Sequence, residues 1–341
     1  MFNEFIINKT NLINNAKILK QKSSNALLCI MAKANAYGVG LKQVVKTLSS
    51  VADFFGVSNS LEAEQTSKYT NKKILIVGSI DKSIKVSNRF SYACHSVEDV
   101  DFLISKNKKI NIHLKINTGM NRYGISSLKE FKTILNRVKH SKLNLEGLFT
   151  HFATADNFVV TQLKKFNIFK KVCKEYGFNP IIHTDNSSVF KKFNNKNAMI
   201  RIGFDMYNCS NNQFMPAVEI KSTIVQINKC KKSDLVGYNR NFVASKPMRV
   251  AVVPVGYADG FSSKYIGLTL NCCNSKCKVL NVCMDCFMID ITSTNIKKGD
   301  SVYLLNKQNP LSKYAKHSGL SEYEVMCNFS HIRASRSLVF S

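Results

Sequence analysis

The fold is decided by a stretch that reads Ile110-Asn-Ile-His-Leu-Lys115, then Leu128-Lys-Glu-Phe-Lys-Thr-Ile-Leu-Asn-Arg-Val138, then Leu145-Glu-Gly-Leu-Phe-Thr-His151. The outer two segments are short apolar runs typical of buried strands. The middle segment has apolar residues at three- and four-residue spacing, as an amphipathic helix does. A strand, a helix and a second strand in this order predict a βαβ unit with parallel strands.

The same alternation fills the first two thirds of the chain. Strand-like runs occupy Leu27–Lys33, Phe54–Ser58, Ile74–Gly78, Phe90–His95, Ile110–Lys115, Leu145–His151, Pro180–Thr184 and Met199–Tyr207, with helix-patterned segments such as Val160–Tyr176 between them. Eight parallel strands close a (β/α)8 barrel, for which about 200 residues suffice. A doubly wound open sheet is the alternative.

The pattern changes after Asn208. The stretch Cys209–Gln213 is polar and predicts a linker. Alternating apolar and polar residues then follow in Val218–Val225, Arg249–Val255, Lys278–Val282, Met288–Thr292 and Ser301–Leu305, with one helix near Leu311–His317. We therefore expect an α/β protein with an N-terminal barrel over residues 1–212 and a C-terminal, mainly β domain over residues 213–341.

Composition excludes several classes of protein. Of 341 residues, 45% are hydrophobic, enough for a sizeable core. No run approaches the roughly 18 apolar residues that cross a bilayer, and the first twenty residues lack the apolar core of a secretory signal. Eleven cysteines without such a signal indicate reduced thiols. We expect a cytoplasmic protein.

The chain is strongly basic, with 49 Lys and Arg against 22 Asp and Glu and a net charge of +27. Such a charge can indicate a nucleic-acid partner. Here the lysines are spread along the whole chain, and no basic run with interleaved aromatic residues occurs. A compositional drift toward Lys, Asn and Ile explains the charge, so we expect no nucleic-acid or membrane partner.

Reactive side chains stand at the ends of the predicted strands. They are Lys33, Lys115, His151, His183 and Arg201, with Arg122 shortly after a strand. Active groups of a barrel lie at the carboxyl ends of its strands. A lysine desolvated there among cations has a lowered pKa and can form a Schiff base. A lysine that extends its ammonium group to solvent is the alternative interpretation.

The segments around these residues resemble the signatures of the alanine racemase family. They read Met31-Ala-Lys-Ala-Asn-Ala-Tyr-Gly-Val-Gly40, Leu114-Lys-Ile-Asn-Thr-Gly-Met-Asn-Arg122, Thr150-His-Phe-Ala-Thr-Ala-Asp156, His183-Thr-Asp-Asn-Ser187, Arg201-Ile-Gly-Phe204, Val236-Gly-Tyr238, Val255-Gly-Tyr-Ala-Asp-Gly260, Cys283-Met-Asp285 and Tyr323-Glu-Val325. The resemblance runs from about residue 5 to residue 336 and implies the same barrel and β domain.

The resemblance implies a homodimeric enzyme that interconverts L-alanine and D-alanine with pyridoxal 5'-phosphate, supplying D-alanine for peptidoglycan. It assigns Lys33 to covalent binding of the cofactor and to the base on the D face of the substrate. Tyr238 is the base on the L face, in the active site of the partner subunit. Proton acceptors on both sides of Cα suit a two-base racemase. A free tyrosine has a pKa near 10, so it needs cationic neighbours. The alternative for a strand tyrosine is a packing residue.

The family also implies roles for other side chains. Cofactor binding falls to Tyr37, His151, Ser187, Arg201, Gly203, Phe204 and Tyr323, substrate binding to Arg122, Tyr257, Met284 and Asp285, and support to Lys115 and His183. In the family the arginine that matches Arg201 faces the pyridine nitrogen of the cofactor, and a guanidinium cannot give up its proton. That nitrogen then stays unprotonated, which favours racemisation over decarboxylation. Lys115 matches a lysine that is often carbamylated in relatives, where it orients the arginine at 122.

Some positions depart from the family pattern. Val39, Asn117 and Asn121 stand where relatives have His, Asp and Gly. Ser263 and Asn281 replace two arginines that line the substrate entrance, although the neighbouring Asp156 is present. A racemase of different or broader specificity, for serine or basic amino acids, is therefore an alternative. A cofactor-binding protein without activity and a nucleic-acid binder are others.

The cysteines near the C-terminal end form a separate motif. Cys283 and Cys286 have CxxC spacing, and with Cys273 and Cys277 they could form a four-thiolate zinc site. Neighbouring Cys272 adds a fifth thiol. This region has the alternation of strands, and Cys283 lies in a racemase signature. We expect no metal.

Overall fold

The computed structural model describes residues 2–187, 189–190, 197–207 and 214–340. It contains two compact units. One comprises Ala16–Ala36 and Val44–Phe204, and the other comprises Met1–Asn15, Tyr37–Gln43 and Asp205–Ser341. The predicted linker Cys209–Gln213, and with it the predicted boundary after residue 212, lies outside the described residues.

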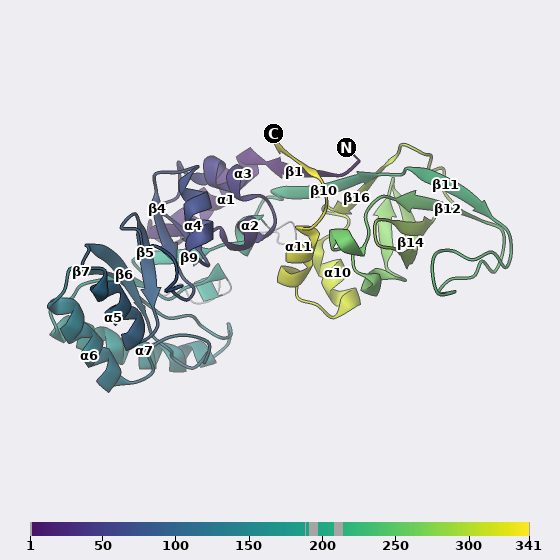
Figure 1. Ribbon diagram of the computed structural model, residues 1–341. Coiled ribbons are helices and arrows are strands. Elements are labelled where there is room, and N and C mark those ends of the chain that lie inside the picture. The colour runs from purple at the N-terminus through teal and green to yellow at the C-terminus, as the bar shows by residue number, and fades with distance from the viewer. Residues whose placement is uncertain (1, 188, 191–196, 208–213, 341) are drawn as a thin grey trace. The chain divides into compact units, whose positions relative to one another are not determined.

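The first unit is an eight-stranded parallel barrel (Figure 1). Its strands are β2 (Leu27–Met31), β3 (Phe54–Val57), β4 (Lys73–Ile76), β5 (Phe90–Cys94), β6 (Ile110–Lys115), β7 (Leu143–Phe149), β8 (Ile181–His183) and β9 (Met199–Ile202). They pair in the order β8-β7-β6-β5-β4-β3-β2-β9. A parallel bridge between Asn186 and Arg201 connects the two ends of this order. The nearly closed sheet confirms the barrel and rules out the open-sheet alternative.

Helices follow the strands: α4 (Ser60–Ser67), α5 (Val97–Ser105), α6 (Leu128–Lys139) and α7 (Phe158–Glu175). Figure 1 shows α5, α6 and α7 outside the strands. Helix α6 buries Phe131, Ile134, Leu135 and Val138, the apolar stripe that its sequence predicts. Ser127 caps this helix, since its side chain accepts from the backbone amide of Glu130. The N-terminal part also contains the helices α1 (Lys9–Lys22) and α3 (Leu41–Leu48) and the turn labelled α2 (Lys33–Tyr37).

The last predicted run, Met199–Tyr207, is only half strand. Strand β9 ends at Ile202, and the helical turn α9 (Phe204–Tyr207) follows Gly203. Similarly, the run Leu27–Lys33 is strand only as far as Met31, because the backbone turns at Lys33. Continuous apolarity does not distinguish a buried strand from a buried helical turn.

The second unit holds two sheets. One has the order β16-β10-β1-β17, from β1 (Glu4–Asn8), β10 (Val218–Thr223), β16 (Ser301–Leu305) and β17 (Ser335–Val339). The other has the order β11-β12-β15-β14-β13, from β11 (Gln226–Cys230), β12 (Met248–Val253), β13 (Thr269–Cys272), β14 (Ser275–Val282) and β15 (Phe287–Asp290). The second sheet is antiparallel throughout. This confirms the predicted mainly β character.

Short helices complete the second unit. They are the 3-10 turns η1 (Tyr257–Asp259) and η2 (Ser263–Tyr265) and the helices α10 (Leu311–Ser318) and α11 (Glu322–Phe329). Aromatic side chains on and near these helices form a packed cluster, in which Phe261, between η1 and η2, stacks on Phe287 of β15 with ring centroids 4.2 Å apart. Tyr314 contacts Phe329 edge to face at 5.2 Å. The sequence interpretation predicted α10 and missed α11. A capping box between Ser321 and Glu324 marks the start of α11 and is visible in the sequence.

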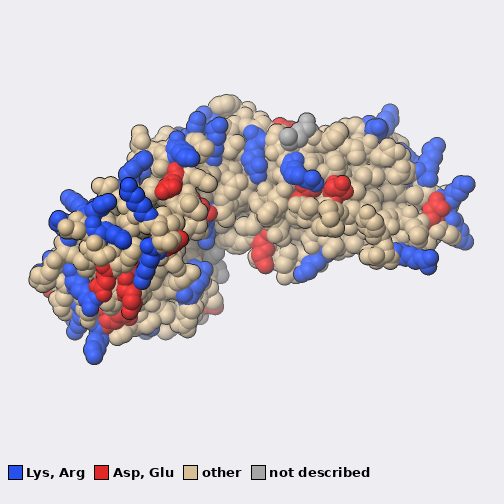
Figure 2. Space-filling view, viewed as in Figure 1, with Lys and Arg blue, Asp and Glu red and all other residues tan. Residues whose placement is uncertain are grey.

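The basic side chains do not gather on the face shown in Figure 2. Lys and Arg are spread over both units, with Asp and Glu among them. This agrees with the even distribution along the sequence. Within the described parts of the chain, no helix has the length and apolar content needed to cross a bilayer.

Candidate active site

Lys33 stands at the start of a strained turn. The three residues that follow, Ala34, Asn35 and Ala36, have left-handed φ/ψ angles of (52°, 54°), (53°, 44°) and (54°, 52°). Non-glycine residues pay roughly 1–2 kcal/mol each for this conformation. The Glu62 carboxylate helps to hold the turn, because its Oε1 accepts from the amide of Ala34 at 2.8 Å. Its Oε2 accepts from the amide of Ser58 at 2.7 Å, just beyond β3. The turn following the predicted nucleophile is thus fixed to the next strand of the barrel.

Four cations predicted from the sequence lie near one another in the barrel. Burial lowers the pKa of Lys115 to about 7, and nearby positive charges add to the effect. Those charges belong to Arg122, Arg201 and Lys33. The Lys115 ammonium lies 5.2 Å from the ring centroid of Tyr123. A cluster of this kind favours an anionic ligand.

Arg201 is almost completely buried, and its guanidinium contacts four residues. Its Nη1 donates to Nδ1 of His183 at 2.9 Å and to the carbonyl of His183 at 2.6 Å. Its Nη2 donates to the carbonyls of Thr150 at 2.9 Å and Thr184 at 3.3 Å, and lies 3.5 Å from Nδ1 of His151. The structure thus brings together Arg201, His151 and His183, to which the sequence resemblance assigns cofactor binding and support.

The charge state of these residues follows from burial. Burial lowers the pKa of Arg201 to about 10, and the negative charge of Asp185 opposes this effect, so the guanidinium stays charged at neutral pH. Burial and the charge of Arg201 hold the pKa of His183 well below its usual range. The pKa of His151 is lowered for the same two reasons. Both imidazoles are therefore neutral.

The loop before Arg122 explains two departures from the family pattern. Nδ2 of Asn117 donates to Oδ1 of Asn121 at 3.0 Å, and Oδ1 of Asn117 accepts from the amide of Asn121 at 3.0 Å. Asn121 has φ of 56°, a left-handed conformation that asparagine adopts more readily than most residues. The two asparagines together make the turn that carries Arg122.

The other residues expected to bind the cofactor fall in both units. Ser187 is buried after β8, and Gly203 and Phe204 follow β9 in the barrel. In the second unit, the ring of buried Tyr37 lies 6.4 Å from the ring of Tyr323 and 5.8 Å from that of Tyr207.

Tyr238, Tyr257 and Met284 are exposed in the second unit, by 68%, 49% and 59%, and neighbouring Asp285 is exposed as well. The amide of Tyr257 donates to the carbonyl of Cys283 at 2.9 Å, and the next amide, that of Ala258, donates to the carbonyl of Met284 at 2.9 Å. A Cβ at Gly256 would lie 2.4 Å from the carbonyl oxygens of Cys283 and Met284, so glycine permits this close approach. Three of the predicted residues are thus large side chains left uncovered within one chain.

Asn281, one of the two positions that replace an arginine, is buried. Its Nδ2 donates to the carbonyls of Val236 at 3.0 Å and Tyr238 at 3.1 Å. Its Oδ1 accepts from the amide of Val282 at 2.8 Å. This side chain fastens the Tyr238 segment to β14. The other position, Ser263, begins η2.

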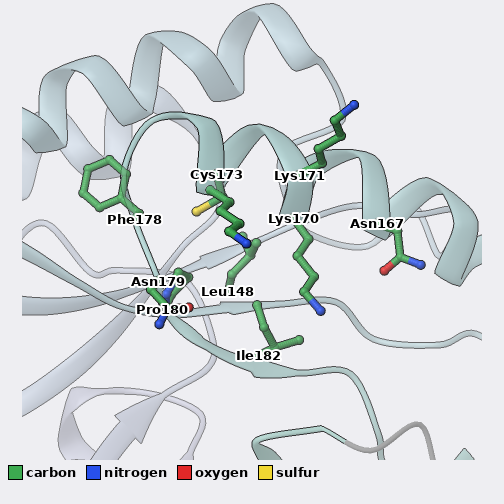
Figure 3. Close-up of a pocket in the computed structure, with 10 residues that line it drawn as sticks. Leu148, Asn167, Lys170, Lys171, Cys173, Phe178, Asn179, Pro180 and Ile182 are labelled. Atoms are coloured by element: carbon green, nitrogen blue, oxygen red, sulfur yellow. The ribbon is translucent and has the colours of Figure 1, made fainter.

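A cavity of about 380 Å³ lies elsewhere on the barrel (Figure 3). Lys170 and Cys173 of α7 line one side of it, and Leu148 of β7 and Ile182 of β8 line another. None of the predicted site residues lines this cavity, so it is not the candidate active site.

Four of the clustered cysteines, all with free thiols, contact one another in two pairs. Cys272 interacts with Cys277, and Cys283 with Cys286. Within the described ranges of the chain, no three His, Cys, Asp or Glu side chains are arranged to hold a metal ion.

Two buried residues of the barrel interior were missed by the sequence interpretation. His113 of β6 and Glu146 of β7 lie in the barrel interior, with Nε2 of His113 3.1 Å from Oε2 of Glu146. Both residues interrupt apolar strand runs, which is a usable signal, since a polar side chain inside a barrel needs a partner.

Two family models match most of the chain. The model described as "Alanine racemase, N-terminal domain" matches residues 7–211, and "Alanine racemase, C-terminal domain" matches residues 217–338. The chain belongs to the alanine racemase family. An alanine racemase of Fusobacterium nucleatum is 35% identical over 327 residues, covering 88% of this chain and 90% of that protein. One of Borreliella burgdorferi is 31% identical, covering 95% and 94%.

Solved structures of the alanine racemase family show the same fold. The alanine racemase of Clostridium difficile 630 superposes with a TM-score of 0.91 at 26% identity, over 100% of this chain and 96% of that one. The alanine racemase of Bacillus anthracis, solved with bound L-Ala-P, gives a TM-score of 0.92 at 26% identity, over 99% and 95%. The barrel and the β domain predicted from the sequence are thus those of alanine racemases.

Proposed function

We propose that the protein interconverts L-alanine and D-alanine with pyridoxal 5'-phosphate as cofactor. The observation that carries the proposal is the cationic cluster of Lys33, Lys115, Arg122 and Arg201 in a chain that matches alanine racemases over nearly its whole length. An amine, two guanidiniums and a lysine of lowered pKa suit an anionic cofactor and an amino-acid carboxylate.

The residues present fit that cofactor. Among the described residues, no acceptor lies within hydrogen-bond distance of the Nε–H of Arg201, whereas both Nη atoms have partners. One donor of a fully charged guanidinium is thus left for a ring nitrogen. We assign the covalent link to Lys33, the ring nitrogen to Arg201 with His151 beside it, and the phosphate to Tyr37, Ser187, Gly203, Phe204 and Tyr323. When bound, the cofactor supplies an electron-withdrawing ring that acidifies the Cα–H of an amino acid.

The remaining roles fall to side chains that hold or move protons and charge. The Nζ of Lys33 takes or returns the proton on one face of Cα, and the Oη of Tyr238 does so on the other face. Arg122 binds the substrate carboxylate, with Lys115 orienting it. Because the guanidinium of Arg201 cannot release a proton, it would leave a ring nitrogen of the bound cofactor unprotonated and would so disfavour side reactions.

We further propose that the active enzyme is a homodimer in which Tyr238, Tyr257, Met284 and Asp285 complete the site of the second copy. Support comes from exposure, because large uncovered tyrosine and methionine side chains mark interaction surfaces. Mixing Lys33→Ala chains with Tyr238→Ala chains tests this, since each heterodimer would contain one intact site. Recovery of activity is expected. No recovery, with heterodimers shown by native mass spectrometry, would contradict shared sites.

The first experiment measures D-alanine formed from L-alanine by purified protein, with and without added pyridoxal 5'-phosphate, beside Lys33→Ala. We expect cofactor-dependent activity in the wild type and none in the variant. A bound-cofactor absorbance without alanine turnover would point to another amino acid. Absence of both would reject the proposal.

Specificity is tested by kcat/KM for alanine, serine and lysine. A broader or shifted substrate preference is the second candidate function. It is favoured because Asn281 and Ser263 stand where relatives have two arginines at the substrate entrance. We expect alanine to be the best substrate, and a larger kcat/KM for serine would reverse this assignment. The supply of D-alanine to peptidoglycan and a cytoplasmic location complete the proposal. Both are tested in cells, by D-alanine dependence of a deletion strain and by fractionation.

A further inference from the structure

A buried polar chain crosses the interior of the barrel and ends at Arg201. Nη1 of Arg201 lies 2.9 Å from Nδ1 of His183, and Nε2 of His183 lies 2.8 Å from Nδ1 of His113. Nε2 of His113 lies 3.1 Å from Oε2 of Glu146. The side chains of His183 and His113 are completely buried, and that of Glu146 is 6% exposed.

The far end of the chain is a carboxylate with further donors. Oε2 of Glu146 also accepts from Oγ of Ser91 at 2.5 Å. Its Oε1 accepts from Nζ of Lys73 at 2.5 Å. Burial alone would raise the pKa of Glu146, but hydrogen bonds from His113, Lys73 and Ser91 outweigh burial and lower it to about 2. Glu146 is therefore ionised and accepts only.

The two ends fix the direction of every bond between them. A guanidinium can only donate, and an ionised carboxylate can only accept. Nδ1 of His183 must therefore be the acceptor, and the proton of His183 sits on Nε2. That proton is donated to Nδ1 of His113, whose own proton sits on Nε2 and is donated to Glu146. Burial lowers the pKa of both histidines, which keeps them neutral.

The backbone is shaped to admit this chain. The β6–β7 register pairs Ile112 with Leu145 and His113 with Gly147, so Glu146 is an extra residue in β7. A Cβ at Gly147 would lie 2.0 Å from Nδ1 of His113. A bulge at Glu146 and a glycine at position 147 thus make room in β7 for the carboxylate and for the imidazole of His113.

A proton relay does not fit this arrangement. Passing a proton from Glu146 toward the site would require Arg201 to accept one, and a guanidinium has no acceptor. The chain can only orient and polarise. It fixes the neutral tautomer of His183 that accepts a hydrogen bond from Arg201. The negative charge of Glu146, at the other end, polarises the two imidazoles between them.

We propose that His113 and Glu146 are positioning residues for racemisation: through His183 they fix the orientation of Arg201, so that its remaining donor is aimed at the cofactor. The inference rests on the proposed function. It predicts that the tautomers of two histidines and the turnover number depend on a carboxylate that touches neither substrate nor cofactor.

The first test reads the tautomers directly in the full-length protein as purified. Nitrogen-15 NMR of histidine-labelled protein, assigned by substituting histidines singly, distinguishes protonated from unprotonated ring nitrogens. We expect His113 and His183 to be neutral and protonated on Nε2 across roughly pH 6 to 8, the range in which an ordinary histidine changes charge. A proton on Nδ1 of His183, or an imidazolium, would overturn the proposal.

The second test uses Glu146→Gln, which keeps the shape but can turn a donor toward His113. The matched control is Asp101→Asn, which alters the carboxylate of an exposed ion pair with Arg137. In Glu146→Gln we expect the Nε2-protonated population of His183 to fall and kcat to drop roughly tenfold or more, as for other residues that orient a functional group. KM should change little, and circular dichroism should show a folded barrel. Wild-type tautomers and kcat in Glu146→Gln would refute the positioning role.

The two proposals fail differently. If the wild type shows the expected tautomers but no cofactor-dependent racemisation, the assigned reaction is wrong, and the positioning role in it falls with it. If the wild type racemises alanine but the histidines carry their protons elsewhere, only the inference about His113 and Glu146 is wrong.

Discussion

The side-chain amide of Asn281 donates to the backbone carbonyl of Tyr238 at 3.1 Å, although the two residues are 43 positions apart in the chain. Asn281 is buried, whereas the Tyr238 side chain is 68% exposed. A Cβ at Gly237 would lie 2.5 Å from Cγ of Asn281, so glycine allows the asparagine to reach past it. The side chain of Tyr238 is thus exposed, while its backbone segment is fixed by the buried side-chain amide of Asn281.

Replacing Asn281 by leucine removes these bonds at similar volume. Two carbonyls and one amide each lose a hydrogen bond inside the protein, so the free energy of unfolding should fall by about 1–3 kcal/mol. The displaced Tyr238 should also lower kcat. Urea titration and racemase assays measure both effects. Asn228→Leu, an exposed position on β11, should change neither. An unaltered kcat in Asn281→Leu would show that Tyr238 needs no such support.

The left-handed turn after Lys33 predicts that two substitutions, one within the turn and one at its carboxylate partner, change stability in opposite directions. Ala34→Gly should stabilise the protein by roughly 0.5–1 kcal/mol, because relief of the backbone penalty exceeds the added entropy of the unfolded chain. Glu62→Ala should destabilise it, because the amides of Ala34 and Ser58 lose their acceptor. Urea unfolding of the two variants and of their combination measures this. Destabilisation by Ala34→Gly would contradict the strain.

Stability should decline in mild acid. The pKa of buried His183 is well below the value near 6.5 of the unfolded chain. Below pH 6.5 the unfolded chain therefore binds a proton that the folded protein does not, so the stabilisation present above pH 6.5 is lost as the pH falls. Each such histidine contributes a slope of at most about 1.4 kcal/mol per pH unit. Urea unfolding at several pH values should give a smaller slope in His183→Gln than in wild type. His140→Gln, at an exposed position, should keep the wild-type slope.

Lys115 should take up carbon dioxide. With its pKa lowered to about 7 by burial and neighbouring cations, a large neutral fraction is present at neutral pH. The free amine attacks CO2, forming an N–C bond and releasing one proton, and the resulting anion is stabilised by Arg122 and Arg201. Carbon-13 NMR with labelled bicarbonate should show a carbamate that Lys115→Arg lacks. The same signal in the variant would place the carbamate on another amine.

The sequence predicted most of the barrel because parallel strands, buried on both faces, remain apolar along their length. It predicted Lys33, Lys115, His151, His183 and Arg201 because the carboxyl ends of barrel strands are where side chains can reach a ligand. Motif resemblance was needed for Tyr238, Tyr257 and Tyr323, since a tyrosine on a strand or short helix has no feature that separates function from packing.

Other features depend on pairs that are distant in sequence. Strand β1 pairs with β10 and β17, so Glu4–Asn8 joins residues more than 200 positions away. The role of Asn281 depends on the approach of Gly237, and that of Glu146 on a register shift between β6 and β7. Neither local propensity nor periodicity contains that information. His113 and Glu146 could still have been suspected as polar residues within apolar runs.

The close approach of Gly147 to the imidazole of His113 also bears on how this family can vary. A methyl group at position 147 would occupy the space of the ring, so a side chain at 147 becomes acceptable only after residue 113 has lost its ring. The two positions should therefore covary among relatives, with substitutions at 147 confined to sequences that carry a smaller residue at 113. Such sequences would also be free to lose the acidic residue at 146. In a double-mutant cycle, Gly147→Ala and His113→Ala should be less harmful together than the sum of their separate effects.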